Sequence, residues 1–304
     1  MREDYTVIRS LSDLHLDNSS YKPVITILRG RKFKEVENTH QLCDKKKLLQ
    51  LTRILSNEGL GVITHVPSAL ENIALLEAID LTNNAITKVP DWLGDLTFLR
   101  NISFHNNNLS CWPLAFDNLN FLETIYLSHN PIGRIPHSAI EHMPNLEKLS
   151  VPYCDLTEFK VQFPSFCQLR YLDLSWNDIE FIDADLSQCN KLEHLNLSNM
   201  KLTSLPKDIF ELLNLTFLSI SGTQVLRVPE EIVQLTKLQF LDLSECELIS
   251  IPLEILMLPN LKELHLGGNY FTEEYKKQII KSAPESLQLD FQGMFDGFDD
   301  SLWD

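Results

Sequence analysis

Asp13 and His15, separated by one residue near the start of the chain, form the pair with the clearest potential for chemistry. On a strand, side chains two positions apart point to the same side, so this pair can hold one metal ion. A catalytic site needs further ligands, and none of the nine histidines pairs with a cysteine at metal spacing. Glycine-rich phosphate loops are also absent. We therefore expect no catalytic residue, no metal and no cofactor.

Residues 8–17 resemble the first metal-binding strand of calcineurin-type phosphoesterases, in which an Asp-x-His pair holds one metal ion. The further motifs of that family, Gly-Asp-x-x-Asp, Gly-Asn-His and a terminal Gly-His-x-His, do not occur in the chain. Asp13 and His15 are best interpreted as polar residues of a cap strand. A metal-dependent phosphoesterase is the least favoured of three functional hypotheses.

The chain carries a leucine repeat that is 23 residues long except for one step of 24. Each copy reads Leu-x-x-Leu-x-Leu-x-x-Asn-x-Leu, with substitutions at the asparagine. Such a short period predicts an array of stacked turns whose function lies on a repeated surface. The copies begin at Leu76, Leu99, Leu122, Leu146, Leu169, Leu192, Leu215, Leu238 and Leu261.

Each repeat contains signals for a strand, a turn and a short helix. Two leucines alternate with a polar residue, which is the period of a strand. The asparagine that follows can bond the backbone of neighbouring turns, and Cys154, Cys246, Thr223 and Met200 replace it in four copies. Proline then recurs where short helices or 3-10 turns can begin. The proline is missing in two copies, so we expect irregular segments near 160–168 and 183–190.

With its Leu-Pro-x-x-Ile half-repeats, as at residues 205–209, the chain resembles leucine-rich-repeat proteins of the typical 23-residue kind. The resemblance covers about residues 61–291. It implies an α/β fold: a right-handed solenoid with a concave parallel sheet and short helices or 3-10 turns on the convex side. Bacterial effectors and intracellular signalling scaffolds both use such repeats.

Both ends of an array expose its core and need caps. Residues 1–60 are expected to form an α/β N-terminal cap, with strand-like segments at 5–8 and 24–28 and a helix over about 39–57. Leu42, Leu49, Ile54 and Leu55 of this helix are expected to point inward. A helical C-terminal cap is predicted at 272–281, followed by a strand near 287–289. Residues 292–304 form an acidic, aromatic tail, which can be a frayed end, an export signal or a docking motif.

The composition of the chain limits the classes of binding partner and the cellular compartments that we expect. The net charge is −16, which disfavours nucleic acid and anionic membranes and favours a basic or mixed-charge protein segment. No apolar run is long enough for a membrane span, and no conventional signal peptide is visible. The six cysteines show no close pairing, which predicts reduced thiols. We expect a protein that is cytoplasmic, or secreted into a host cell by another route, and monomeric.

Side chains between the strand leucines should point out of the concave sheet and align in columns. Two of these columns, with the turn residue that follows them, bring aromatic residues onto one face, although the leucines already fill the core. Exposed neighbouring aromatics resemble interface hot spots. The predicted partner-binding residues are Tyr126, His129, Tyr153, Tyr171, Trp176, His194, Phe217 and Phe240, with Asp173, Asp242 and Glu245 to pair with basic groups of the partner.

These observations favour a non-catalytic solenoid that binds a protein through its concave face, in the setting of a bacterial effector acting in a host cell. The alternative is an intracellular scaffold or regulatory subunit of a phosphatase or small-GTPase pathway. An affinity experiment in which the aromatic residues are substituted distinguishes a binding face from a sheet whose exposed aromatic residues contact no partner.

Overall fold

The computed structural model describes residues 5–8, 24–29, 32–36, 53–57, 64–66, 68–72 and 75–292. Contacts divide the chain into two compact units. Unit 1 comprises residues 1–156 and 160–169, and unit 2 comprises residues 157–159 and 170–304. No helix among the described residues is long and apolar enough to cross a membrane.

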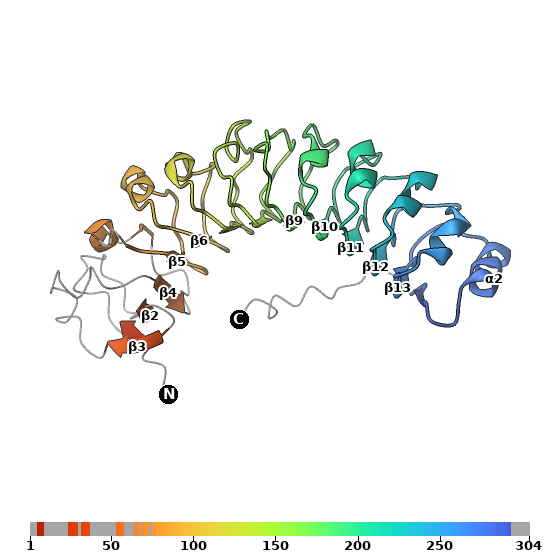
Figure 1. The fold of residues 1–304 in the computed structure, drawn as a ribbon, viewed down its shortest axis with the longest axis horizontal. Coiled ribbons are helices and arrows are strands. Elements are labelled where there is room, and N and C mark those ends of the chain that lie inside the picture. The colour runs from red at the N-terminus through yellow and green to blue at the C-terminus, as the bar shows by residue number, and fades with distance from the viewer. Residues whose placement is uncertain are drawn as a thin grey trace. The chain divides into compact units, whose positions relative to one another are not determined.

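Unit 1 contains strands β1 (Tyr5–Ile8), β2 (Val24–Arg29), β3 (Lys32–Val36), β4 (Arg53–Asn57), β5 (Ala78–Asp80), β6 (Asn101–Ser103), β7 (Thr124–Tyr126) and β8 (Lys148–Ser150). Its 3-10 helices are η3 (Ser68–Asn72), η4 (Asp91–Asp95) and η5 (Leu114–Asn118). Strands β2 and β4 pair antiparallel, whereas β4 to β8 pair in parallel and in sequence order. Figure 1 shows η4 and η5 on the side away from strands β5 and β6.

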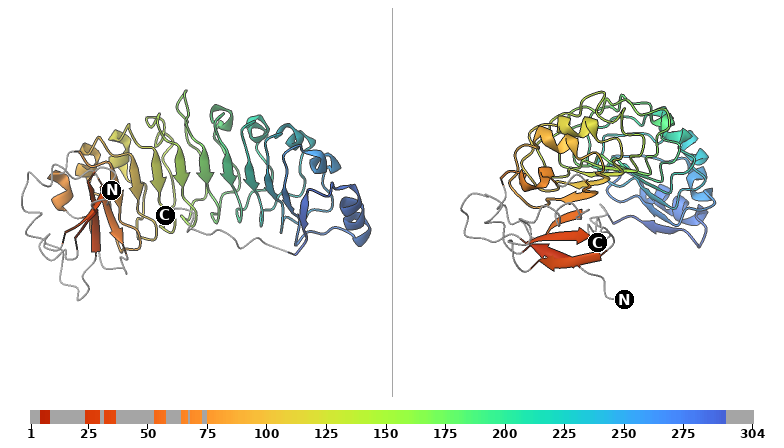
Figure 2. Two further views of the ribbon diagram at one scale, coloured as in Figure 1. Left: turned by 60° about the horizontal axis from the view of Figure 1, so that its bottom comes forward. Right: turned by 60° about the vertical axis from the view of Figure 1, so that its left-hand side comes forward.

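Unit 2 contains the parallel strands β9 (Tyr171–Asp173), β10 (His194–Asn196), β11 (Phe217–Ser219), β12 (Phe240–Asp242), β13 (Glu263–His265) and β14 (Gln288–Asp290). Its 3-10 helices are η6 (Leu186–Gln188), η7 (Lys207–Glu211), η8 (Glu230–Gln234) and η9 (Leu253–Met257), and helix α2 spans Glu273–Ser282. The strands lie side by side in one layer, as the left view of Figure 2 shows.

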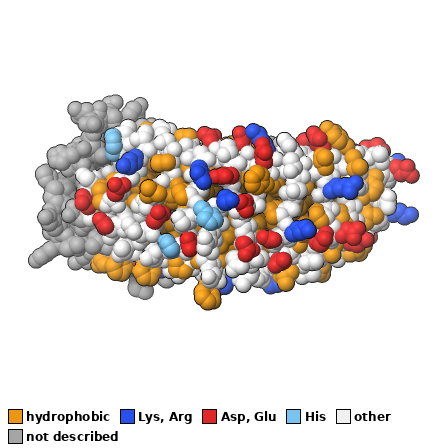
Figure 3. Space-filling model, turned by 90° about the horizontal axis from the view of Figure 1, so that it is seen from above, with side chains coloured by type: hydrophobic (Ala, Val, Ile, Leu, Met, Phe, Trp, Pro, Cys, Tyr) orange, Lys and Arg blue, Asp and Glu red, His pale blue; other side chains and the backbone are white. Residues whose placement is uncertain are grey.

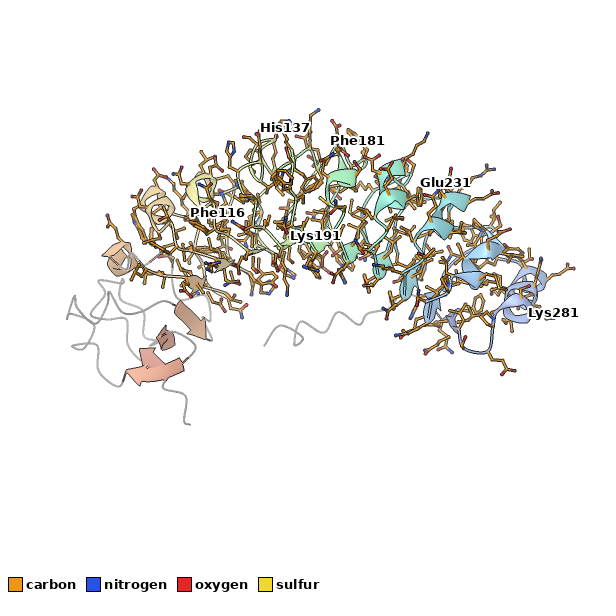
Figure 4. The ribbon with its side chains drawn as sticks, in the orientation of Figure 1. Phe116, His137, Phe181, Lys191, Glu231 and Lys281 are labelled. Atoms are coloured by element: carbon orange, nitrogen blue, oxygen red, sulfur yellow. The ribbon has the colours of Figure 1, made fainter. Side chains whose placement is uncertain are left out.

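The core of each repeat is filled by its leucines, as predicted. Leu172, Leu195, Leu218 and Leu241 point inward from the middle of successive strands and are fully buried. Phe116 of unit 1, labelled in Figure 4, is also fully buried, whereas Glu231 and Lys281 of unit 2 are exposed. The predicted fold class, a leucine-repeat solenoid with a parallel sheet and short 3-10 turns, is confirmed.

The asparagine ladder has the predicted role. Asn107 Nδ2 donates to the carbonyl oxygens of Leu81, 2.8 Å away, and Phe104, 3.0 Å away, while its Oδ1 accepts from Ile86 N at 3.0 Å. Where cysteine replaces asparagine, the thiol takes over one of these bonds, as Cys246 Sγ does to Ile220 O at 3.1 Å. At Asn107, Asn130 and Cys246, a buried polar side chain therefore ties its turn to the preceding one.

The short helices also follow the sequence signals. Proline precedes η4, η5, η7, η8 and η9 as the N-cap residue. Among the described residues no helix stands between β8 and β9, and η6 has three residues, which confirms the two predicted irregular segments. Pro136 precedes turns instead of a 3-10 helix, a departure that the sequence did not indicate.

The caps agree with the sequence only in part. Helix α2 begins after Thr272, whose Oγ1 accepts from Tyr275 N at 3.1 Å, and β14 occupies the place of the predicted last strand. The predicted helix over 39–57 is wrong at its end, because Arg53–Asn57 is strand β4 and pairs with β2 and β5. Its earlier residues, Asp13, His15 and the tail from residue 293 lie outside the described residues. The domain boundaries at 60 and 291 remain predictions.

Candidate functional site

In unit 2, the first residues of four successive strands form a continuous stack of aromatic rings, here called the ring stack: Tyr171, His194, Phe217 and Phe240. In-register parallel pairing sets these residues beside one another. Ring centroids lie 4.3 Å apart for Tyr171 and His194 and 3.9 Å apart for His194 and Phe217. Phe217 and Phe240 follow at 4.6 Å, with planes only 3° apart. Strand spacing of about 4.8 Å therefore builds the stack directly.

Stacking determines which part of each ring meets solvent. Tyr171 is buried at 7% exposure, in contrast to the expectation of an exposed ring, and the other three rings are half-buried. Because neighbouring rings cover the faces, the ring edges form most of the accessible surface. Aromatic edges carry the positive end of the ring quadrupole. The ring stack therefore suits apolar groups and carbonyl oxygens better than cations placed over a ring face.

His194 is neutral at ordinary pH. Its imidazole lies between the rings of Tyr171 and Phe217, and this burial lowers its pKa to about 3. A protonated imidazole is disfavoured there because burial removes much of the hydration that would stabilise the charge. His194 thus acts as a flat ring in the stack at neutral pH.

Two of the predicted acidic partner-binding residues serve their own turns. Asp173 is 3% exposed, and its Oδ1 accepts from Ser175 N at 2.9 Å and Ser175 Oγ at 2.7 Å. Asp242 is 2% exposed and accepts from Ser244 N at 3.0 Å and from Ser244 Oγ. Burial raises the pKa of Asp173. The prediction that these carboxylates face a partner is not supported by this placement, and of the three acids Glu245 is the exposed one.

The residue before each ladder position adopts a left-handed backbone conformation. This holds in both units, with φ between 51° and 65° at Asn83, Asn106, His129, Tyr153, Trp176, Asn199, Gly222, Glu245 and Gly268. Asparagine and glycine tolerate this conformation, whereas other residues adopt it at an energetic cost. Tyr153, Trp176 and Glu245 are therefore the members that backbone geometry favours least, whereas histidine, as at His129, is found there more often. All four belong to the predicted site.

Unit 1 carries a smaller group of rings. His129 stacks on Tyr153 with ring centroids 4.3 Å apart, and His105 meets His129 edge-on at 5.2 Å. His129 is exposed and the Tyr153 side chain is 40% exposed, as predicted. Tyr126 is half-buried, and burial raises the pKa of its hydroxyl to about 12. His105, His129 and Tyr153 thus form a row of adjoining rings in unit 1.

Two histidines of the strand side escaped the sequence prediction. His105 bonds Ser128 Oγ through its Nδ1 and touches the ring of His129. His265 is 4% exposed, lies 4.9 Å from the ring of Phe240 and is 3.4 Å from Asp290 Oδ2 through Nδ1. The position of His265 in the column beside the ring stack was the available signal, but contacts between columns depend on side-chain rotamers.

The structure offers little for catalysis within its described residues. No group of three or more His, Cys, Asp or Glu side chains there is arranged to hold a metal ion. Cys111, Cys154, Cys167, Cys189 and Cys246 are free thiols. The side that carries the 3-10 helices shows acidic, basic and apolar side chains interspersed, without a large area of one kind (Figure 3). The strand side therefore remains the most distinctive surface.

Comparison with known families settles the family. One model, of a leucine-rich repeat region, matches residues 153–283, and a second, of a single leucine-rich repeat, matches residues 121–143. The chain is a leucine-rich-repeat protein. Proteins of this kind typically act as non-catalytic modules that bind protein partners over an extended repeated surface. No curated protein matches the sequence of this leucine-rich-repeat chain.

Solved structures of leucine-rich-repeat proteins superimpose on the chain. A leucine-rich-repeat protein of Leptospira interrogans is 32% identical with a TM-score of 0.72, and the match covers 81% of this chain and 62% of that protein. The ectodomain of an Arabidopsis thaliana receptor kinase, solved with Casparian strip integrity factor 2, is 25% identical with a TM-score of 0.59, covering 74% and 28%. The repeat domain of the type III effector XopL shares the fold alone, at 23% identity and a TM-score of 0.52, covering 75% and 72%.

Proposed function

We propose that this leucine-rich-repeat protein is a non-catalytic binding module that recognises a protein segment through the strand side of unit 2. The ring stack carries the proposal. Four rings occupy positions where folding requires only a residue that fits a strand, because the core leucines beneath them are already fully buried. Their edges form a rigid, apolar surface that needs no reordering when a partner docks, so little conformational entropy is lost.

The charge of the protein favours a basic or mixed-charge partner. The chain has a net charge of −16, and Glu245 adds an exposed carboxylate in the same repeat as Phe240. Such a potential steers positively charged segments toward the surface and repels nucleic acid. A partner with apolar anchors and at least one basic residue fits this combination.

A bacterial effector acting in a host cell is the biological setting that we propose. The match to a bacterial leucine-rich-repeat protein at 32% identity supports a bacterial source, and the fold shared with the repeat domain of a type III effector is consistent with this setting. The alternative setting is an intracellular scaffold or regulatory subunit of a phosphatase or small-GTPase pathway. Secretion of the protein from bacteria that carry an effector export system, and its loss when that system is deleted, distinguishes the two.

Affinity capture from host-cell lysate tests the binding face. The wild-type chain and the double variant Trp176→Ala/Phe217→Ala serve as baits, and Phe181→Ala, an exposed aromatic of unit 2 outside the strands, is the matched control. We expect a protein that is retained by the wild type and the control but lost from the double variant. Circular dichroism confirms that every bait is folded. Equal capture by all three baits contradicts the proposal.

A further inference from the structure

The carboxyl group of Glu245 lies against the glycine of the next repeat. Its backbone is left-handed, with φ of 54°, where the neighbouring repeats have Gly222 and Gly268. A Cβ on Gly268 would lie 2.2 Å from the carboxyl group, so the side chain of Glu245 lies directly against the glycine of the next repeat. No ion pair or hydrogen bond joins this carboxylate to any described residue. Glu245 thus occupies an unfavourable backbone position and presents an exposed carboxylate.

The same column holds Trp176 three repeats earlier. Trp176 is also left-handed, with φ of 55°, and its side chain is 45% exposed. Asn199 and Gly222 lie between the two, and the Asn199 amide packs against Gly222, because a Cβ there would lie 2.4 Å from Asn199 Oδ1. The column therefore offers an apolar ring at one end, a small polar centre and a carboxylate at the other end.

The distance between Trp176 and Glu245 indicates the conformation of a polypeptide segment that would contact both residues. Three strand spacings separate Trp176 from Glu245, about 14 Å at ~4.8 Å each. An extended segment advances about 3.3 Å per residue, so positions i and i+4 are about 13 Å apart and point to the same side. A helix places same-side residues about 10 or 16 Å apart, at i+7 or i+11, and fits this spacing less well.

We propose that the partner is an extended polypeptide segment that crosses the strands of unit 2, with a lysine or arginine on Glu245 and a large apolar side chain on Trp176 four residues away. The residue halfway between them faces Asn199 and Gly222 and is small or polar. This inference rests on the proposed function, since it specifies the partner of the same surface. The two left-handed residues supply selectivity, and the ring stack of the same repeats supplies apolar area.

A random 12-residue peptide library displayed on phage, selected against the immobilised full-length protein, tests the inference. We expect enriched peptides that contain Lys or Arg four positions from an aromatic or large aliphatic residue. Binding of a synthetic enriched peptide, measured by fluorescence anisotropy, should weaken about tenfold in Glu245→Gln. Replacing the basic residue of the peptide with Gln should cause a similar loss, and the two changes combined should weaken binding little further.

Glu247→Gln is the matched control, because Glu247 is also exposed and left-handed, with φ of 58°, but lies beyond the ladder position. It should bind the peptide as the wild type does. The inference is overturned if the enriched peptides lack the basic residue. It is also overturned if Glu245→Gln weakens binding less than twofold while Trp176→Ala or Phe217→Ala abolishes binding. Both outcomes leave the proposed function standing. If no peptide is enriched over an uncoated surface, or if none of these variants changes peptide binding, both the inference and the proposed function are overturned.

Discussion

Acidification should weaken unit 2 through a single imidazole, that of His194. The ring lies between Tyr171 and Phe217, and its pKa in the folded protein is about 3, against an ordinary value near 6.5. Below pH 6.5 the unfolded chain binds a proton that the folded chain does not bind. The contribution of His194 is therefore fully present above pH 6.5, and it is lost as the pH falls toward 3.

The magnitude follows from the two pKa values. Each pH unit within this window costs up to about 1.4 kcal/mol, so the loss between pH 7.5 and pH 5 is about 2 kcal/mol. His194→Phe keeps a flat ring in the stack, as the parallel rings of Phe217 and Phe240 demonstrate, and removes the titrating group. The free energy of unfolding of this variant should change less than that of the wild type over the same interval, by about 2 kcal/mol.

Urea denaturation followed by circular dichroism at pH 7.5, 6 and 5 measures this difference. Comparing the two proteins cancels the titration of other groups, including Asp173, whose raised pKa acts in the opposite direction. Histidine NMR signals provide an independent check, because the His194 resonances should not titrate between pH 8 and 5. Parallel pH profiles for the two proteins, within about 0.5 kcal/mol, would refute the argument that stacking keeps the imidazole neutral.

Three further changes test the backbone positions and the ladder. Glu245→Asn should raise the free energy of unfolding by about 0.5–1 kcal/mol, because asparagine tolerates the left-handed conformation better, and a decrease in urea denaturation would contradict this. Gly268→Ala should destabilise the protein by about 1 kcal/mol or more, through its φ of 65° and its contact with the Glu245 carboxyl group, and should destabilise less when Glu245 is also alanine. Asn107→Ala should lower the free energy of unfolding by about 1–3 kcal/mol, because it leaves the buried amide of Ile86 without its partner, whereas the carbonyl of Leu81 keeps its bond from Asn84 Nδ2. An unchanged melting temperature for Asn107→Ala would mean that water replaces the ladder.

The repeat made most of the fold predictable. Leu172, Leu195 and Leu218 recur at a fixed interval, so one strand assignment applied to every copy, and the missing prolines marked the irregular segments. The N-terminal segment lacks this redundancy. The apolar residues Ile54 and Leu55 fit the inner face of a helix as well as a strand, and the pairing of β4 with β2 and β5 decided the outcome.

The candidate site was predictable as a set of columns but not as a set of contacts. Sequence spacing placed Asp173 and Asp242 beside the aromatic column, yet only the coordinates show that each carboxylate turns back to its own serine. A short side chain two residues before a serine can bond its own turn or face a partner, and the period of the repeat does not distinguish these choices. The left-handed backbone at Glu245 did have a signal in the sequence, because the same repeat position holds asparagine or glycine at Asn83, Asn106, Asn199, Gly222 and Gly268. Glu245 itself does not reveal it, and the requirement is recognised only when the copies are aligned.

The strand side of unit 2 therefore combines two kinds of residue with opposite relations to stability. The ring stack is self-supporting, since each ring packs on the next and the same contacts that shape the surface also stabilise the sheet. Trp176 and Glu245 occupy backbone positions that asparagine or glycine would fill at lower energy. Residues that folding does not favour are the better indicators of function, because selection for stability alone would replace them. Substitution of the stack should thus affect stability and binding together, whereas substitution of Glu245 should separate them.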